Sequence, residues 1–152
     1  MINKIINRLF KPNIERLKAR WDIDGLIKAL NHRDYRIRKK AAEALGDMKA
    51  KEAVDALIKT LKDENSEVRK AAAYALGRIG DEKAIKPLAE ALKDESIDVR
   101  LEAAKSLKEI GYKKVAELPE LISEVLNISK SEAFKILENI RKGKFDFFKK
   151  GI

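Results

Sequence analysis

Apolar and small residues recur along this chain in a pattern that repeats every 31 residues. Each copy begins with a β-branched residue and an arginine, followed by a pair of alanines and then a leucine. The copies hold Ile37-Arg38, Val68-Arg69 and Val99-Arg100, then Ala41-Ala42, Ala72-Ala73 and Ala103-Ala104, then Leu45, Leu76 and Leu107. A fixed period of about 20 to 50 residues marks units that bury their apolar faces only against their neighbours. The pattern therefore predicts a solenoid.

Each copy predicts two helices. In the middle copy Asn65 or Ser66 caps a first helix, which runs to about Ile79 and stops at Gly80. Asp81 then caps a second helix that ends near residue 93. The apolar stripe of this second helix recurs upstream at helical spacing: Ile85, Leu88, Ala89 and Leu92; Val54, Leu57, Ile58 and Leu61; Ile23, Leu26, Ile27 and Leu30. We expect an all-α chain, since Ala, Leu, Lys and Glu also favour helix.

The regular repeats are predicted to span residues 12–127, with extra segments at both ends. Residues 1–11 carry apolar side chains at helical offsets and basic residues between them, which predicts a short amphipathic helix. This helix could cap the first repeat, dock on a partner or a second copy, or lie on a membrane surface through residues 2–10. In residues 128–152 the period decays into a degenerate cap, which is a terminal helix capped by Ser129 and a basic tail rich in Phe.

The tail has two open interpretations. It could fold back as a hydrophobic cap, or it could project as a peptide that binds a partner. If it projects, Phe145, Phe147 and Phe148 are the expected anchors, because buried aromatic side chains dominate interface energies. The stretch Pro119–Glu138 is also similar to a helix-turn-helix, although a degenerate repeat explains the same apolar positions.

The repeated motif resembles a known family. The units Asp34-x-x-Ile37-Arg38-x-x-Ala41-Ala42-x-Ala44-Leu45-Gly46 and Val68-Arg69-x-x-Ala72-Ala73-x-Ala75-Leu76-Gly77 resemble the short HEAT-like repeats of the phycobilisome-lyase type. The opening around Pro12 looks like the N-terminal cap of archaeal members. The resemblance covers about residues 10–126. It implies a right-handed α-solenoid of antiparallel helix pairs, with second helices lining the concave face, and scaffold or adaptor roles.

The arginine of each copy has a structural and a functional interpretation. The resemblance implies that Arg38, Arg69 and Arg100 bond an acidic or capping residue of an adjacent unit. The candidates for that role are Asp34, Asn65, Ser96, Asp63 and Asp94. The alternative is a column of cations that binds anions. We favour the structural interpretation.

The residues that catalysis needs are scarce. The chain has no Cys and a single His, His32, so neither a Cys/His pair nor a zinc site of the usual kind can form. We therefore expect a protein that is not an enzyme and that holds no metal, cofactor or small molecule. The lack of Cys fits a cytoplasmic chain. No apolar run approaches the roughly 18 residues that cross a membrane.

The leading hypothesis is an adaptor that binds another protein through its concave face and exposed ends. The outward positions of the second helices carry both signs of charge and no aromatic residue, as suits a protein partner. The candidate contact residues are Lys28, Asp55, Lys59, Lys62, Lys86, Glu90 and Lys93.

The alternative hypothesis is a protein that binds the phosphate backbone of DNA or RNA. The formal net charge is +9, and residues 1–50 hold 13 Lys and Arg against 6 Asp and Glu. Basic side chains that face phosphates bind nucleic acid through counterion release. The candidate residues are Arg33, Arg36, Lys39, Lys40, Lys142 and Lys144. A solvated lysine-rich surface would carry the same charges.

Overall fold

The computed structural model describes residues 2, 5, 11–111 and 118–150, and within them the regular structure is entirely helical. The longer elements are α2 (Ile14–Ala19), α3 (Ile23–Ala29), α4 (Tyr35–Asp47), α5 (Val54–Thr60), α6 (Ser66–Ile79), α7 (Ile85–Ala91), α8 (Ile97–Ile110), α9 (Leu118–Leu126) and α10 (Lys130–Arg141). The described residues also form three short 3-10 helices: η1 (Lys51–Ala53) and η2 (Glu82–Ala84), which lead into α5 and α7, and η4 (Phe145–Lys150), which follows α10. Among these described residues, every helix is too short or too polar to span a lipid bilayer.

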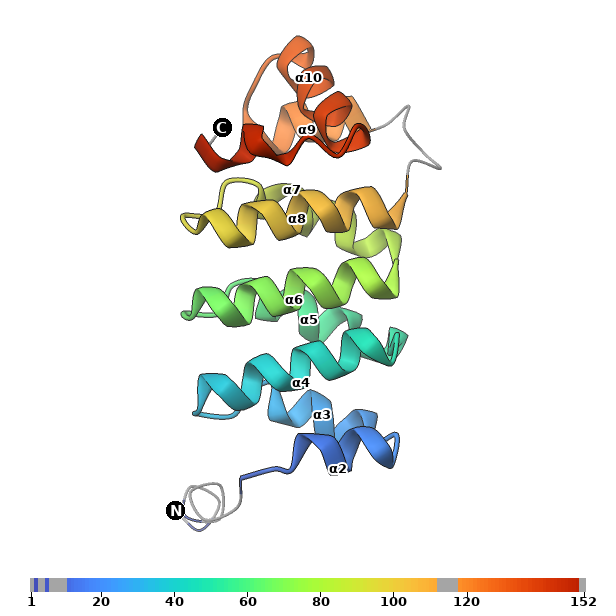
Figure 1. Cartoon of the computed structure of the whole chain (residues 1–152), viewed down its shortest axis with the longest axis vertical. Helices are drawn as coiled ribbons and strands as arrows, with labels where there is room; N and C mark the ends of the chain where they lie inside the picture. Colours follow the sequence, from blue (N-terminus) through green and yellow to red (C-terminus); the bar gives the residue numbers. More distant parts are fainter. Residues whose placement is uncertain (1, 3–4, 6–10, 112–117, 151–152) are drawn as a thin grey trace.

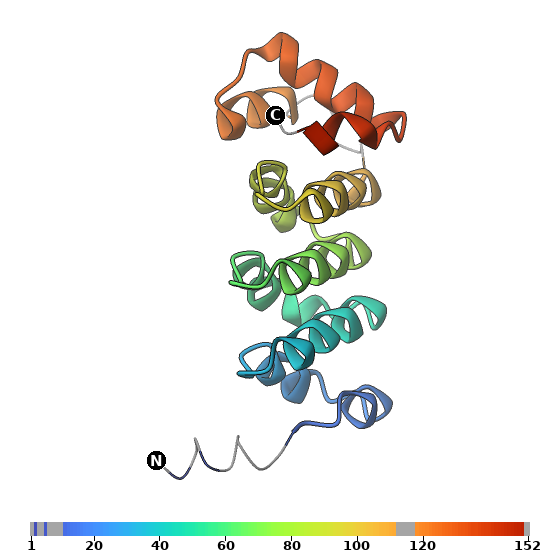
Figure 2. The same cartoon turned by 60° about the vertical axis from the view of Figure 1, so that its left-hand side comes forward.

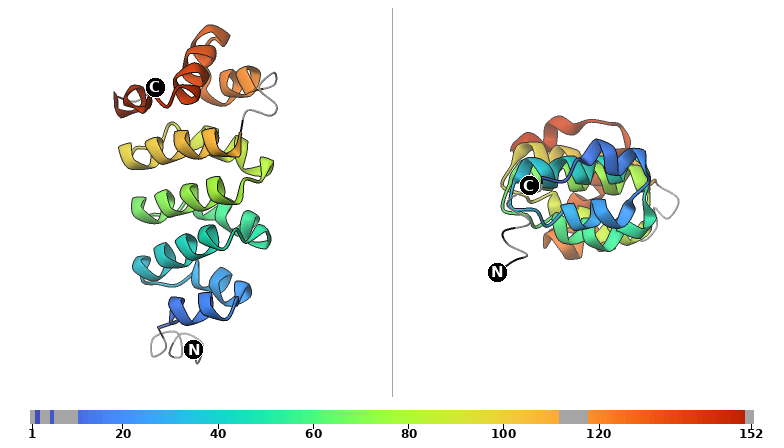
Figure 3. Two further views of the ribbon diagram at one scale, coloured as in Figure 1. Left: turned by 45° about the vertical axis from the view of Figure 1, so that its right-hand side comes forward. Right: turned by 90° about the horizontal axis from the view of Figure 1, so that it is seen from below.

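The helices stack as an elongated rod of two parallel layers. The first helices of successive units, α2, α4, α6 and α8, lie side by side in one layer, and α3, α5 and α7 form the other (Figures 1 and 2). Helices α2 and α10 lie toward opposite ends of the rod, and the view from below shows the successive units superimposed (Figure 3). The predicted all-α solenoid is confirmed.

Helix boundaries follow the predicted signals in the middle unit. Asn65 is the N-cap of α6, and its side-chain oxygen accepts hydrogen bonds from the backbone N–H groups of Glu67 and Val68. Gly80 ends the helix with φ of 75°, a left-handed backbone that glycine adopts at low cost. Asp81 accepts from the N–H of Lys83 at the start of η2, which leads directly into α7.

Small residues let the first helices approach closely. The alanine pairs at 41–42, 72–73 and 103–104 are fully buried. A Cβ added to Gly46 would lie 2.6 Å from the Cα of Ala75, and one added to Gly77 would lie 2.8 Å from the Cα of Ser106. Ser106 also donates a hydrogen bond to the carbonyl of Ala73 at 2.8 Å. Contacts at this distance explain why glycine and alanine repeat at these positions.

The last elements close the rod. Helix α9 packs on α7 and α10, in the place of a further second helix. The tail η4 runs across α8 between that helix and α10 (Figure 1). Phe148 is fully buried there, so the structure has the folded-back form of the tail.

Two predictions about the chain ends remain predictions. The proposed boundary at residues 127/128 coincides with the turn between α9 and α10, where Asn127 has φ of 52°. Of the predicted amphipathic helix in residues 1–11, only Ile2, Ile5 and Lys11 fall among the described residues. Ile2 and Ile5 are helical and exposed.

Candidate binding surfaces

Two repeated arginines hold adjacent units together. The guanidinium of Arg38 donates to both carboxylate oxygens of Asp63 at 2.8 and 2.9 Å, and Arg69 donates to both oxygens of Asp94 at 2.9 and 3.0 Å. Each arginine is buried. The Nη1 group of each arginine donates to two backbone carbonyls in the loop before its own helix. The structural interpretation of the first two arginines is therefore confirmed.

Arg100 is held differently. The residue 25 positions after it is Val125, which has no carboxylate and lies within α9, whereas Asp63 and Asp94 lie in the loops after α5 and α7. Instead, the guanidinium donates to the backbone carbonyls of Phe148 at 2.8 Å and Lys149 at 3.1 Å. The folded-back tail therefore takes the position of the missing acidic residue.

Two grooves open between the second helices. The groove between α3 and α5 has a volume of about 520 Å³, and its apolar floor includes Ile27, Leu30 and Ala56. The groove between α5 and α7 has a volume of about 280 Å³, and Ile58 and Leu61 take the equivalent positions on its floor. The same hollow thus recurs one unit further along the rod.

Five of the seven predicted contact residues line these grooves. Asp55 and Lys59 lie at the first groove, Glu90 and Lys93 at the second, and Lys62 at both. All five are exposed, although Lys93 also donates to the carbonyl of Val125 at 3.0 Å.

Lys28 on α3 and Lys86 on α7, the remaining two, are exposed but line neither groove.

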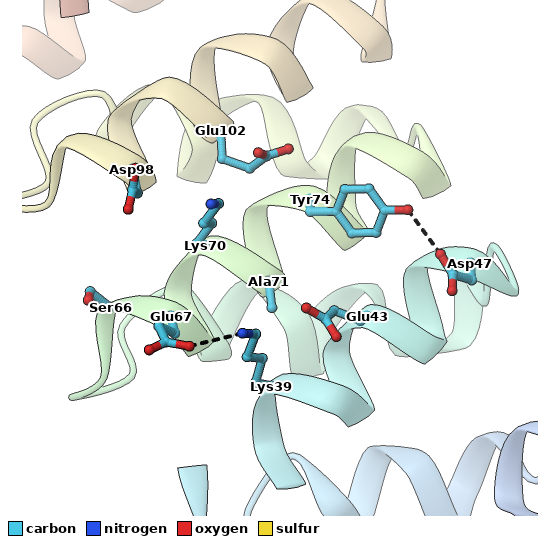
Figure 4. Close-up of a pocket in the computed structure, with 10 residues that line it drawn as sticks. All are labelled: Lys39, Glu43, Asp47, Ser66, Glu67, Lys70, Ala71, Tyr74, Asp98 and Glu102. Carbon is cyan, nitrogen blue, oxygen red and sulfur yellow. Dashed lines mark hydrogen bonds and ion pairs between the residues drawn. The ribbon is translucent and has the colours of Figure 1, made fainter. Parts of the chain in front are cut away.

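A third groove, which the sequence analysis missed, lies on the layer of first helices. It has a volume of about 540 Å³ and spans α4, α6 and α8 (Figure 4). Its lining is mostly charged, and Ala71 and Tyr74 supply the apolar surface. The lining residues are Lys39, Glu43, Asp47, Ser66, Glu67, Lys70, Ala71, Tyr74, Asp98 and Glu102.

Internal contacts occupy much of this third groove. Lys39 pairs with Glu67 at 2.9 Å, and Tyr74 donates its phenol O–H to Asp47 at 2.9 Å (Figure 4). Lys18 of α2 pairs with the other oxygen of Asp47 at 2.8 Å. The hydrogen bonds from Lys18 and Tyr74 hold the pKa of Asp47 below its usual value. Burial raises the pKa of Glu102 at the opposite rim.

The groove lies over a short side chain. Ala71 of α6 lines it, and longer side chains of the neighbouring first helices, among them Glu43 of α4 and Glu102 of α8, line it on either side. A short residue on one first helix with long residues on its two neighbours would have been the signal in the sequence.

The candidate phosphate-binding residues are not brought together. One set lies around the start of α4 and consists of Arg33, Arg36, Lys39 and Lys40. The other set, Lys142 and Lys144, follows α10, and helices α6 and α8 lie between the two sets (Figure 1).

Most of these cations also have partners. Arg36 donates twice to Asp34 at 3.0 Å, Lys142 pairs with Glu138 at 2.8 Å, and Arg33 has interactions of its own. Within the described chain, only Lys40 and Lys144 of the six have no ion-pair partner.

The three predicted tail anchors have different environments. Phe148 is fully buried, Phe145 is half-buried, and Phe147 is 42% exposed. Phe148 therefore anchors the tail on the protein itself and is not accessible to a partner in this conformation.

His32 has a local role. Its Nδ1 accepts a hydrogen bond from the backbone N–H of Asp34 at 3.0 Å, as the carboxylates of Asp63 and Asp94 do for the N–H groups two residues after them. Across residues 11–111 and 118–150, no three His, Cys, Asp or Glu side chains are close enough to hold a metal ion.

Comparison with known proteins places the repeat in a family. A family model described as HEAT repeats matches residues 23–108, which is more than half of the chain. No curated protein matches the chain.

Proposed function

Since this chain belongs to the HEAT-repeat family, whose repeats commonly mediate interactions between proteins, we propose that it is a scaffold that binds another protein across the face of its second helices. The HEAT fold is typically a non-enzymatic scaffold. The finer resemblance to the phycobilisome-lyase type, the archaeal-like cap and the cytoplasmic location stay predictions.

The observation that carries this proposal is the pair of equivalent grooves between α3, α5 and α7. Each combines an apolar floor with a charged rim, and protein interfaces have the same composition, with an apolar centre and a polar periphery. Because the grooves are adjacent and share Lys62, an extended segment or a helix could contact both. The rim carries both signs of charge, which selects partners more than it strengthens binding.

The first-helix groove is a weaker candidate. Its acidic and basic side chains largely pair with one another, so a partner would have to compete with the existing contacts of Lys39 and Asp47. We therefore assign the main surface to the second helices.

Charge reversal on the two faces tests the proposal. The variant Lys59→Glu/Lys62→Glu changes two exposed rim residues of the second-helix grooves. The matched control, Lys70→Glu/Lys105→Glu, changes two exposed lysines of the first helices. We expect a partner protein isolated with the wild type to remain with the control and to be lost with the first variant.

Equal recovery with both variants would contradict the proposal. Retention of nucleic acid in place of protein would contradict it as well, provided that this retention falls steeply with salt, because counterion release makes phosphate contacts strongly salt-dependent. Such salt-sensitive retention would support the alternative function, binding of the phosphate backbone of nucleic acid.

A further inference from the structure

The C-terminal end of the rod carries a groove between two exposed aromatic side chains. It has a volume of about 510 Å³ and is lined by Phe134, Lys135, Glu138, Asn139 and Phe147. Phe134 is 60% exposed and Phe147 is 42% exposed. The groove is formed by α10 and η4, which lie beyond the last regular repeat (Figure 2).

Neither exposed ring is needed to fill the core. Helix α10 buries Ala133, Ile136, Leu137 and Ile140, whereas Phe134 lies outside this buried stripe and is exposed. In η4 the buried residue is Phe148, and the ring of Phe147 stands against it edge-on, with centroids 5.4 Å apart. Phe147 therefore lines the groove, while Phe148 is buried beside it.

The charges around the groove are predominantly positive. Residues 129–150 contain seven Lys and Arg and three Asp and Glu. The one carboxylate that lines the groove, Glu138, is neutralised by Arg141 at 2.6 Å and Lys142 at 2.8 Å, and these cations lower its pKa to about 2. Lys135 lines the groove with no ion-pair partner among the described residues.

We propose that this groove docks an acidic segment of another protein, with apolar side chains inserted between Phe134 and Phe147 and carboxylates facing Lys135. Aromatic rings supply most of the contact energy in such grooves, and complementary charge fixes the orientation of the segment. The site lies apart from the second-helix grooves, so it goes beyond the scaffold surface proposed above.

The charge pattern argues against two other occupants. A second copy docked by the same face would bring two positively charged caps together, which costs energy. A nucleic acid needs a row of available cations along several phosphates. Four of the seven basic side chains in the cap, Lys130, Arg141, Lys142 and Lys149, already pair with carboxylates.

Selection from a display library of random peptides of about twelve residues tests the proposal. The full chain serves as bait, and peptides that bind the Phe134→Ala variant equally well are removed. Phe134 is the residue to change because it is exposed on α10, whereas Phe147 supports the buried ring of Phe148. We expect the recovered peptides to be acidic and to carry Leu, Ile or Phe at helical spacing.

The affinity of a recovered peptide is then measured by fluorescence anisotropy. We expect Phe134→Ala and Lys135→Glu each to weaken binding by at least about tenfold. The matched control, Tyr35→Ala, removes an exposed aromatic from the start of α4 and should leave affinity unchanged. Lys59→Glu/Lys62→Glu should also leave it unchanged, which separates this site from the second-helix surface.

Three results would overturn the proposal. One is recovery of no peptide, or of peptides without acidic character. Another is binding of fluorescent oligothymidine that depends on Phe134. The last is a dimer in sedimentation equilibrium that Phe134→Ala dissociates, since a second copy would then cover the groove.

Discussion

Arg100 donates a hydrogen bond of 2.8 Å to the backbone carbonyl of Phe148, 48 residues further along the chain. In the preceding copy the same guanidinium nitrogen, Nε of Arg69, donates to a carboxylate oxygen of Asp94. A neutral carbonyl thus replaces a charged acceptor at the last copy. The tail therefore supplies the acceptor for the last repeated arginine, although the sequence of the tail does not resemble a repeat.

Removing Arg100 should release the tail. We expect Arg100→Ala to lower the free energy of unfolding by about 1.5–3 kcal/mol, because hydrogen bonds made by a charged donor contribute about that much. The tail should then be cleaved faster by trypsin at Lys144, Lys149 or Lys150. Urea titration and a digestion time course measure the two effects. Arg141→Ala, which breaks an exposed pair, is the control. It should change the free energy of unfolding by at most about 1 kcal/mol and should leave the cleavage rate of the tail unchanged. An unchanged cleavage rate in Arg100→Ala would show that the tail is held by other contacts.

Replacing an internal arginine should destabilise the fold more than replacing an exposed one. We expect Arg69→Ala to destabilise the protein by about 3–5 kcal/mol, because it leaves the carboxylate of Asp94 without its buried partner. Arg36→Ala, which breaks an exposed pair with Asp34, should cost at most about 1 kcal/mol. Thermal and urea unfolding of the two variants measure the difference. Similar losses would mean that the buried pair contributes no more than a surface pair.

A single methyl group should disturb the contact between α4 and α6. We expect Gly46→Ala to cost about 1–3 kcal/mol, because its Cβ would meet the backbone of Ala75 and the helices would have to move apart. Lys40→Ala on the exposed side of α4 should change stability by less than about 0.5 kcal/mol. Equilibrium unfolding in urea is the measurement. A neutral Gly46→Ala would show that this spacing can relax without loss.

The contributions of Glu102 and Asp47 to the stability of the fold should change with pH in opposite directions. Because burial raises the pKa of Glu102 in the folded state, its favourable contribution is present at low pH and is lost as pH rises through the folded pKa. We therefore expect Glu102→Gln to melt at a higher temperature than the wild type at pH 7 and at a similar temperature at pH 3.

Asp47 has the opposite sign. Its pKa is lowered in the folded state, so its contribution is present above the ordinary Asp pKa and is lost as pH falls through the folded pKa. Asp47→Asn should melt below the wild type at pH 7, and the difference should shrink in acid. Melting curves of both variants at several pH values test the pair. Shifts of the same sign would contradict the environments described for these two side chains.

The sequence predicted those features that depend on one unit and its neighbour. The 31-residue spacing and the caps at Asn65 and Asp81 predicted the helices, and the family resemblance implied that an arginine such as Arg69 bonds an acidic or capping residue of an adjacent unit. Five residues of the second-helix grooves were also predicted as contact residues.

Features that join distant segments could not be predicted in this way. Nothing in the repeat indicates that a backbone carbonyl 48 residues away would satisfy Arg100. The groove beside Phe134 likewise depends on where the tail lies, and a tail without periodicity gives no register from which to place it. Side chains from three units line the groove over Ala71, and an apolar pattern does not record the shape that they form together.

The tail also covers the surface on which a further helix pair would pack. Helix η4 lies against α8, and the carbonyls of Phe148 and Lys149 already accept the hydrogen bonds of the Arg100 guanidinium. Anyone extending this array with another repeat would have to displace the tail and supply a new acceptor for Arg100. An uncovered end of a helical array can stack on another molecule. Because η4 covers α8, the tail also limits the end-to-end growth of fibres from this end of the rod.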